Sequence, residues 1–212
     1  MKLKDKYHRL KAKNRLYEVE VPLIGLTGGI ASGKSTVGRL LMAQGLPVIN
    51  ADHLVKDVYA LPEVHSFVKQ TYPEVMKADS ILFPLLREKV FSDPQVKAQI
   101  ESLIYQKLPL AFMNALGKLG KPEVIVYDVP LLFEKNMGNF FDLTVLVYTP
   151  RKTQRDRLMG RDGHHELMAD TILNQQMDIE EKRSKADFVI ENMASEIELT
   201  EEVKQFLRQT FD

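Results

Sequence analysis

The sequence predicts an α/β fold, a doubly wound five-stranded parallel sheet with an inserted helical subdomain and a helical lid. Three observations support this fold. Apolar segments of strand length alternate with amphipathic helical segments, a glycine-rich motif joins the first strand to the first helix, and about sixty mostly helical residues separate the second strand from the third. The expected strands cover residues 22–26, 46–49, 123–128, 144–148 and 186–192. The closing helix is expected to face the core with Ile197, Val203, Phe206 and Leu207.

The glycine-rich motif lies in residues 27–36, which read T-G-G-I-A-S-G-K-S-T and match the pattern G-x-x-x-x-G-K-[ST]. Its glycines let consecutive backbone N–H groups face phosphate oxygens, and the following helix adds the positive end of its dipole. Lys34 can reach the β- and γ-phosphates, and the Ser35 hydroxyl can bind Mg²⁺. An apolar strand precedes the motif and a helix ended by Gly45 follows it, which is the order that a P-loop requires. The sequence therefore predicts a P-loop NTPase fold whose nucleoside triphosphate contacts are Gly28, Gly29, Ile30, Ala31, Ser32, Gly33, Lys34, Ser35 and Thr36.

The composition excludes several classes of protein. The chain has 212 residues, of which 44% are hydrophobic and 27% charged, as in ordinary globular proteins. Its 29 basic and 29 acidic residues give zero net charge, which argues against a basic nucleic-acid-binding surface. The lack of cysteine excludes disulfides, thiolate–zinc sites and cysteine nucleophiles. We find no apolar run of about eighteen residues and no signal peptide, so we expect a cytoplasmic protein without a membrane segment, as a monomer or weak homo-oligomer.

Residues 1–20 form a basic extension ahead of the P-loop domain at residues 21–212. The first fifteen residues hold seven lysines and arginines against a single acid, Asp5. A basic helix can bind a membrane or nucleic acid, but the apolar residues here are too few for firm insertion. We therefore expect a solvated helical or frayed segment that says little about function.

Two acidic residues follow expected strands. Asp52 comes shortly after residues 46–49, and Asp128 ends the strand at residues 123–128. In open parallel sheets the ligand lies at the carboxyl ends of the strands, beside the glycine loop. Asp52 can accept a proton from an attacking hydroxyl there or hold a water on Mg²⁺, and a helix N-cap is its alternative role. Asp128 resembles the acid that follows the second nucleotide-binding strand of P-loop proteins, so it is a candidate metal ligand.

Residues 60–120 are expected to be almost wholly helical. They exceed the single crossover helix that joins two parallel strands, so they predict an inserted subdomain for the second substrate. Arg87 and Lys89 are its candidate phosphate contacts, although lone basic residues on helices are commonly only solvated.

Residues 151–170 form the expected lid, because they start directly after the strand at residues 144–148. Arg157 and Arg161 are four residues apart, on one helical face. Lid arginines can bring positive charge to a phosphoryl group in transfer, and the alternative is a solvated basic helix with interleaved acids. The adjacent His164 and His165 lack a metal-binding spacing and are discounted as a metal site.

Taken together, these residues resemble the dephospho-CoA kinase family from about residue 22 to residue 208. The most specific matches are P-L-L-F-E at residues 130–134 and A-D-F-V-I-E-N at residues 186–192. Further matches are Asn50-Ala51-Asp52, Leu86-Arg87, Arg157 with Arg161-Asp162, and Gln176-Met177 with Lys182.

The resemblance implies that the ribose 3′-hydroxyl of dephospho-CoA attacks the γ-phosphate of ATP in the presence of Mg²⁺. Asp52 matches the family's general base, and Lys34, Arg157 and Arg161 match the groups that stabilise the transferred phosphoryl group. The resemblance adds Asn192 to the nucleotide contacts and Ser35, Asp52 and Asp128 as a metal site. The acceptor contacts that it implies are Asp52, Arg87, Pro130, Leu131, Leu132 and Glu134.

The acceptor half departs from the family pattern. Asn50 replaces the first acid of D-A-D, Tyr105 and Gln106 stand where His-Pro is usual, and residues 83–85 lack an arginine that is common there. Two alternatives therefore remain: another small P-loop kinase, acting on a nucleoside monophosphate or small metabolite, and a nucleotide switch or weakened nucleotide-binding protein. A GTPase switch would need an N-K-x-D motif, which the sequence lacks. A weakened protein would be expected to have lost Lys34 or Asp52, and both are present.

Overall fold

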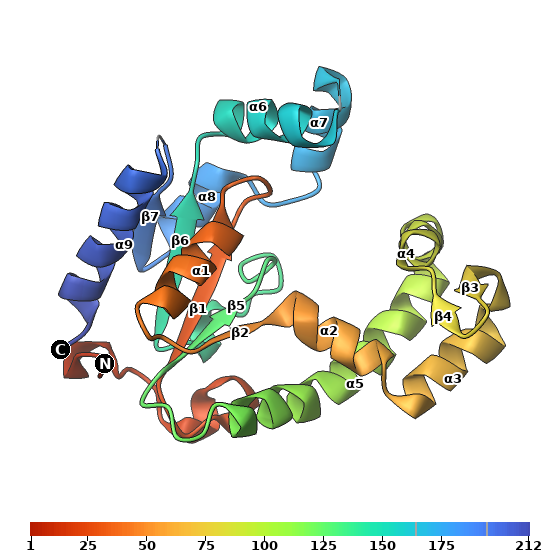
Figure 1. Ribbon diagram of the computed structural model, residues 1–212, viewed down its shortest axis with the longest axis horizontal. Helices are drawn as coiled ribbons and strands as arrows, with labels where there is room; N and C mark the ends of the chain where they lie inside the picture. Colours follow the sequence, from red (N-terminus) through yellow and green to blue (C-terminus); the bar gives the residue numbers. More distant parts are fainter. Residues whose placement is uncertain (164, 194) are drawn as a thin grey trace. The chain divides into compact units, whose positions relative to one another are not determined.

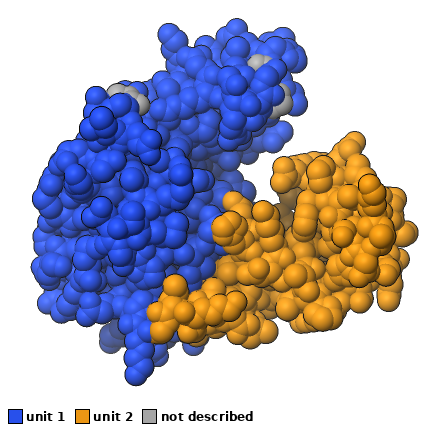
Figure 2. All heavy atoms as spheres, viewed as in Figure 1, with its two compact units in different colours: residues 1–50, 121–212 blue, residues 51–120 orange. Residues whose placement is uncertain are grey.

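The computed structural model describes residues 1–163, 165–193 and 195–212. The chain divides into two compact units, which are coloured separately in Figure 2. Unit 1 consists of Met1–Asn50 and Lys121–Asp212, and unit 2 is Ala51–Gly120.

Unit 1 is built on a five-stranded parallel sheet, as the sequence predicts (Figure 1). The strands are β1 (Leu23–Gly28), β2 (Val48–Asn50), β5 (Ile125–Asp128), β6 (Leu143–Tyr148) and β7 (Phe188–Glu191). Their order is β2-β5-β1-β6-β7, so the central strand β1 pairs in parallel with both β5 and β6. All carboxyl ends therefore meet at one edge of the sheet, where the glycine loop starts.

Helices cover both faces of this sheet. The helices α1 (Lys34–Ala43) and α9 (Glu196–Thr210) share one core with the sheet, through residues such as Val37, Leu26 and Phe206. Ile179 of α8 (Ile179–Lys185) packs on Leu146 and Tyr148 of β6 in a separate cluster. Because side chains alternate along a strand, these two residues lie opposite those that face α1 and α9. The expectation that Ile197 of α9 faces the core is wrong: it is 83% exposed on the first turn.

The helices α6 (Arg151–Asp162) and α7 (Glu166–Leu173) pack against each other and against the glycine loop (Figure 1). Leu158, Ala169 and Leu173 form the small cluster between them. Ile30 and Ala31 of the glycine loop pack on the same cluster. The predicted lid segment thus has apolar contact with the loop itself. His164, which was discounted as a metal ligand, lies outside the described residues.

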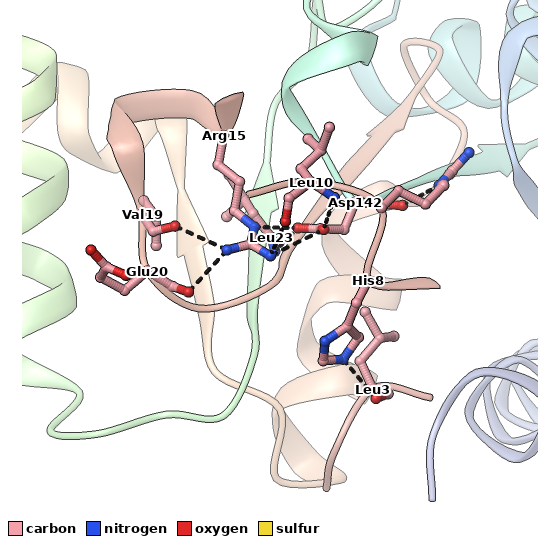
Figure 3. Close-up of polar contacts among 9 residues, drawn as sticks. Leu3, His8, Leu10, Arg15, Val19, Glu20, Leu23 and Asp142 are labelled. Carbon is pink, nitrogen blue, oxygen red and sulfur yellow. Dashed lines mark hydrogen bonds and ion pairs between the residues drawn. The ribbon is translucent and has the colours of Figure 1, made fainter. Parts of the chain in front are cut away.

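The basic extension is not frayed, as was expected, but is part of unit 1 and is anchored by a few buried residues, while most of its lysines are exposed. Three 3₁₀ turns form it: Asp5–Tyr7, Ala12–Asn14 and Leu16–Glu18. Leu3 is fully buried and bridges to Phe211 near the other end of the chain. Arg15 is only 7% exposed, and its Nε lies 2.6 Å from Oδ2 of the fully buried Asp142 (Figure 3).

The Arg15–Asp142 pair explains how one arginine of this basic segment can be buried. The Arg15 guanidinium also donates to the carbonyl oxygens of Leu10 and Glu20, at 2.7 and 2.9 Å. Asp142 in turn accepts from the N–H groups of Leu10 and Leu23, at 3.0 and 2.9 Å (Figure 3). Buried charges are tolerated when they are paired and hydrogen-bonded in this way. The network ties the extension to the amino ends of β1 and β6.

Unit 2 is mostly helical, with one departure from the prediction. Its helices are α2 (Ala51–Tyr59), α3 (Pro62–Thr71), α4 (Phe83–Ser92) and α5 (Pro94–Lys118), with a 3₁₀ turn at Pro73–Val75. A short antiparallel hairpin of β3 (Met76–Lys77) and β4 (Ser80–Ile81) lies between α3 and α4. Ala78 makes the turn with φ of 52°, and two-residue strands are too short to give an alternating pattern. Among the described helices, none combines the length and apolar character that a membrane crossing requires.

Candidate active site

The glycine loop (residues 28–33) is held from behind by Asn192, which follows β7. Gly33 has φ of 86° and directly precedes α1, a conformation that favours glycine. A Cβ atom on Gly33 would lie 2.1 Å from Nδ2 of Asn192. That amide donates to the carbonyl oxygen of Ser32 at 2.8 Å. Asn192 therefore braces the backbone of the loop, whose Ser32 side chain is fully buried.

A lysine–carboxylate pair lies at the carboxyl edge of the sheet. Nζ of Lys34, on the first turn of α1, pairs with Oδ1 of Asp128 at the end of β5. Nδ2 of Asn50, at the end of β2, donates to Oδ2 of Asp128 at 2.7 Å. Asp128 is 2% exposed. Lys34, Asn50 and Asp128 therefore meet at a position that water hardly reaches.

This edge suits a magnesium ion bound mostly through its substrate. In the described part of the chain no group of three or more His, Cys, Asp and Glu side chains could hold a metal. Mg²⁺ is usually held by one or two carboxylates together with phosphate oxygens and water. Asp128 and the exposed Ser35 hydroxyl, one residue beyond Lys34, are donors of the kind that Mg²⁺ prefers.

The two lid arginines have different surroundings. Arg157 is half-buried, and its guanidinium donates to the carbonyl oxygen of Asn192 at 3.1 Å and to Oγ1 of Thr149 at 3.3 Å. Thr149 donates to the Asn192 carbonyl oxygen at 2.9 Å. Arg161 is exposed and forms a two-point pair with Asp162, with both distances 2.8 Å. Arg157 thus contacts residues that support the glycine loop, whereas Arg161 lies on the surface of the lid.

The P-L-L-F-E turn (residues 130–134) packs on the end of β1 that leads into the glycine loop. The carbonyl oxygen of Pro130 accepts from Oγ1 of Thr27 at 3.2 Å, and Leu132 is fully buried against Gly25. A Cβ atom on Gly25 would lie 2.5 Å from Cδ1 of Leu132, so the turn needs a glycine in β1. Leu131 is exposed, and the Glu134 carboxylate pairs with Nζ of Lys182 at 2.6 Å.

Unit 2 has a pocket of its own, with a volume of about 650 Å³. Its lining includes both Asp52 and Arg87, which lie 35 positions apart in the sequence and were expected to contact the acceptor. Asp52 is not an N-cap, because Asn50 precedes the helix and Asp52 is the second residue of α2. Burial raises the pKa of the Tyr59 phenol, which keeps it a neutral donor. The other lining residues include Lys56, Phe83 and Phe91.

Several residues that support the glycine loop were not predicted from the sequence as site residues. Thr149 and Gln154 are buried behind the loop, and Nε2 of Gln154 donates to the Thr149 carbonyl oxygen at 2.8 Å. Gln176 accepts from the N–H of Ile30 at 3.0 Å. Gln176 and Lys182 were noted only as family matches. The full burial of Lys182 could not be read from a sequence in which the charged Glu181 and Arg183 flank it.

Comparison with known proteins identifies relatives along most of the chain. The family model described as dephospho-CoA kinase matches residues 22–198. A dephospho-CoA kinase from Anaeromyxobacter dehalogenans is 39% identical over 176 residues, which cover 80% of this chain and 83% of that protein. One from Fusobacterium nucleatum is 34% identical over 190 residues, covering 89% and 98%.

Solved structures agree with these relatives. The crystal structure of a Thermus thermophilus protein has a TM-score of 0.79 at 31% identity, covering 89% of this chain and 97% of that one. A dephospho-CoA kinase from Campylobacter jejuni has a TM-score of 0.64 at 28% identity, covering 88% and 96%. The basic extension lies before the residues that the family model matches.

Proposed function

Because this chain belongs to the dephospho-CoA kinase family, we propose that it transfers the γ-phosphate of ATP to the ribose 3′-hydroxyl of dephospho-CoA, giving coenzyme A and ADP. Membership of a kinase family implies that ATP is used. The observation that carries the proposal is the Lys34–Asp128 pair beside the glycine loop, in a chain that matches this family over residues 22–198.

In this proposal the glycine loop, Lys34 and Arg161 bind the donor, ATP. The loop N–H groups and Lys34 bind the phosphates, and Arg161 adds positive charge as negative charge spreads over the equatorial oxygens of the transferred group. Arg157 acts more indirectly in this proposal, because its contacts are with the Asn192 carbonyl oxygen and Thr149.

The acceptor side falls to the pocket that Asp52 and Arg87 line. Asp52 takes the proton of the 3′-hydroxyl while the bond from that oxygen to the γ-phosphorus forms. The bond from the γ-phosphorus to the bridging oxygen breaks, and ADP leaves with the electron pair. Arg87 and Lys56 provide positive charge in the same pocket for the phosphates of dephospho-CoA. Pro130 and the exposed Leu131 are the proposed apolar acceptor contacts on unit 1, whereas the fully buried Leu132 anchors the turn and cannot contact the acceptor.

Mg²⁺ is the proposed metal, with Ser35 and Asp128 as its protein ligands and Asp52 as a further contact through water. When bound, Mg²⁺ neutralises phosphate charge and orients the triphosphate. Chelation with EDTA should therefore abolish phosphate transfer, and added Mg²⁺ should restore it. Transfer that persists at full rate in EDTA would contradict the metal proposal.

An acceptor comparison tests the proposed function. ADP release from Mg·ATP is measured with dephospho-CoA, with AMP, and without an acceptor. Dephospho-CoA should raise the rate well above the other two. A rate raised by AMP alone would indicate a nucleoside monophosphate kinase, and no rise with either acceptor would overturn the proposal.

Two further properties are proposed with this activity. We expect the protein to work in the cytoplasm, where ATP and small coenzyme precursors are available, and cell fractionation checks this. We also expect a monomer or weak homo-oligomer, since the reaction as proposed needs residues of one chain. Sedimentation of the purified protein over a range of concentrations tests the second expectation.

A further inference from the structure

Lys182 of α8 is a fully buried lysine that has no part in the proposed chemistry. Its Nζ lies 2.6 Å from Oε1 of Glu134, the last residue of the P-L-L-F-E turn. The same Nζ lies 3.4 Å from the carbonyl oxygen of Gly28, the first residue of the glycine loop. The Lys182 ammonium group therefore contacts both the glycine loop and the P-L-L-F-E turn.

The segment that carries Lys182 makes two more contacts with the same two elements. Oε1 of Gln176 accepts from the backbone N–H of Ile30 in the glycine loop at 3.0 Å. The N–H of Met177 donates to Oε1 of Glu134 at 3.2 Å. The chain between α7 and α8 is thus fixed to the loop at Ile30 and to the turn at Glu134.

Stability alone is a poor reason for a buried ion pair at this place. Removing two charges from water costs several kcal/mol each, and replacing a buried pair by apolar residues is often neutral or stabilising. The Lys182–Glu134 pair is not even fully satisfied, because Oε2 of Glu134 is buried without a hydrogen-bond partner among the described residues. Unsatisfied buried polar atoms in a native protein call for an explanation.

We propose that Lys182 and Glu134 form a positioning pair for phosphate transfer, which sets the glycine loop and the P-L-L-F-E turn at a fixed spacing. This inference rests on the proposed function, in which the loop holds the donor and the turn contacts the acceptor. Misplacing two reacting groups by about 1 Å can cost about 100-fold in rate. In this role Glu134 acts through Lys182 and the turn, and it need not touch the acceptor.

The test is a double variant that removes both charges, Lys182→Met with Glu134→Gln. It leaves no unpaired buried charge, so it should fold with a melting temperature close to that of the wild type. We expect kcat with dephospho-CoA to fall by about 10- to 100-fold while KM for ATP changes less than about threefold, because the loop still presents its own N–H groups. The single variant Lys182→Met should lose more activity and also unfold more readily, since it leaves the Glu134 carboxylate buried alone.

The matched control removes another buried ion pair of unit 1, through Arg15→Met with Asp142→Asn. That pair lies at the amino ends of β1 and β6, away from the glycine loop, so kcat should stay within about twofold of the wild type. A folded Lys182→Met/Glu134→Gln variant with unchanged kcat would overturn the positioning role.

Hydrogen exchange separates this inference from the proposed function. Amide exchange in a peptide spanning residues 28–32 should be faster in the double variant than in the wild type, whatever the acceptor is. If dephospho-CoA does not stimulate the wild type, the proposed function fails, and the exchange result still decides the structural link. Equal exchange in the two proteins would contradict the link.

Discussion

Asp52 is the residue on which the proposed chemistry depends most. It is exposed on the first turn of α2 and lines the pocket of unit 2 with Arg87. Asp52→Asn should lower kcat by roughly 10²–10⁴-fold and leave ATP binding nearly unchanged, because a general base acts in the transition state and the amide cannot take the proton.

Asp57 offers a matched control for that substitution. It is an exposed aspartate on the same helix, and it is not among the residues that line the pocket. Steady-state kinetics of Asp57→Asn should match the wild type. Equal turnover by the Asp52→Asn and Asp57→Asn variants would mean that Asp52 is not the base.

Changing each of the two lid arginines to glutamine should have different effects on kcat and on the melting temperature. Arg161→Gln should lower kcat by roughly 10- to 1000-fold with little change in melting temperature, because Arg161 is exposed and supplies charge. Arg157→Gln should lower the melting temperature as well, because the Asn192 carbonyl oxygen and Thr149 lose a donor.

Kinetics and thermal melts of both variants check this difference, with the exposed Lys152→Gln on the same helix as control. If Arg161→Gln keeps full activity, the alternative of a merely solvated lid arginine is correct.

At the scale of elements, β1 depends on a glycine that faces the P-L-L-F-E turn. Gly25→Ala places a methyl group 2.5 Å from Cδ1 of Leu132 and 3.0 Å from Phe141, so overpacking should destabilise the protein by about 1–3 kcal/mol. Gly38→Ala in α1 should instead stabilise it by about 0.5–1 kcal/mol, because the nearest atom is 4.0 Å from the added carbon and alanine is the better helix former.

Urea denaturation of both glycine variants measures these changes in the free energy of unfolding. A Gly25→Ala protein as stable as the wild type would show that the turn can move away from the sheet. The close packing of Leu132 on β1 would then not require a glycine at position 25.

The elements that the sequence predicted best are those with a strong local signal. The apolar strands, the glycine loop and the amphipathic helix α1 follow from side-chain spacing and from glycine chemistry, which act over a few residues. The β3–β4 hairpin was missed because each strand has two residues. Ile197 was assigned to the core because it is apolar, although the first turn of α9 leaves it exposed.

At the scale of the whole molecule, the basic extension is part of unit 1. Arg15 and Asp142 are 127 residues apart, so no local pattern could predict their contact. For the same reason the brace of Asn192 on Ser32 and the pairing of Glu134 with Lys182 became visible only in the fold. The sequence could nominate many residues of the site, but the supports behind it depend on contacts between distant segments.

Arg15→Met tests how much the basic extension contributes to the stability of the folded protein. The variant leaves the Asp142 carboxylate buried without its cation, so the free energy of unfolding should fall by about 3–5 kcal/mol. The kcat of the folded variant should stay near that of the wild type, since the pair lies at the amino ends of the strands. Urea denaturation and an activity assay check both parts, and an unchanged unfolding midpoint would mean that the extension packs without stabilising the protein.

Isotope tracing of the transferred phosphoryl group tests the account most directly. The protein is incubated with dephospho-CoA, Mg²⁺ and ATP labelled in the γ-phosphate, and the products are separated and located by ³¹P NMR. We predict that the label appears as a monoester on the ribose 3′-oxygen, in an amount equal to the ADP formed. Label found only in inorganic phosphate, or on another acceptor oxygen, would contradict the account.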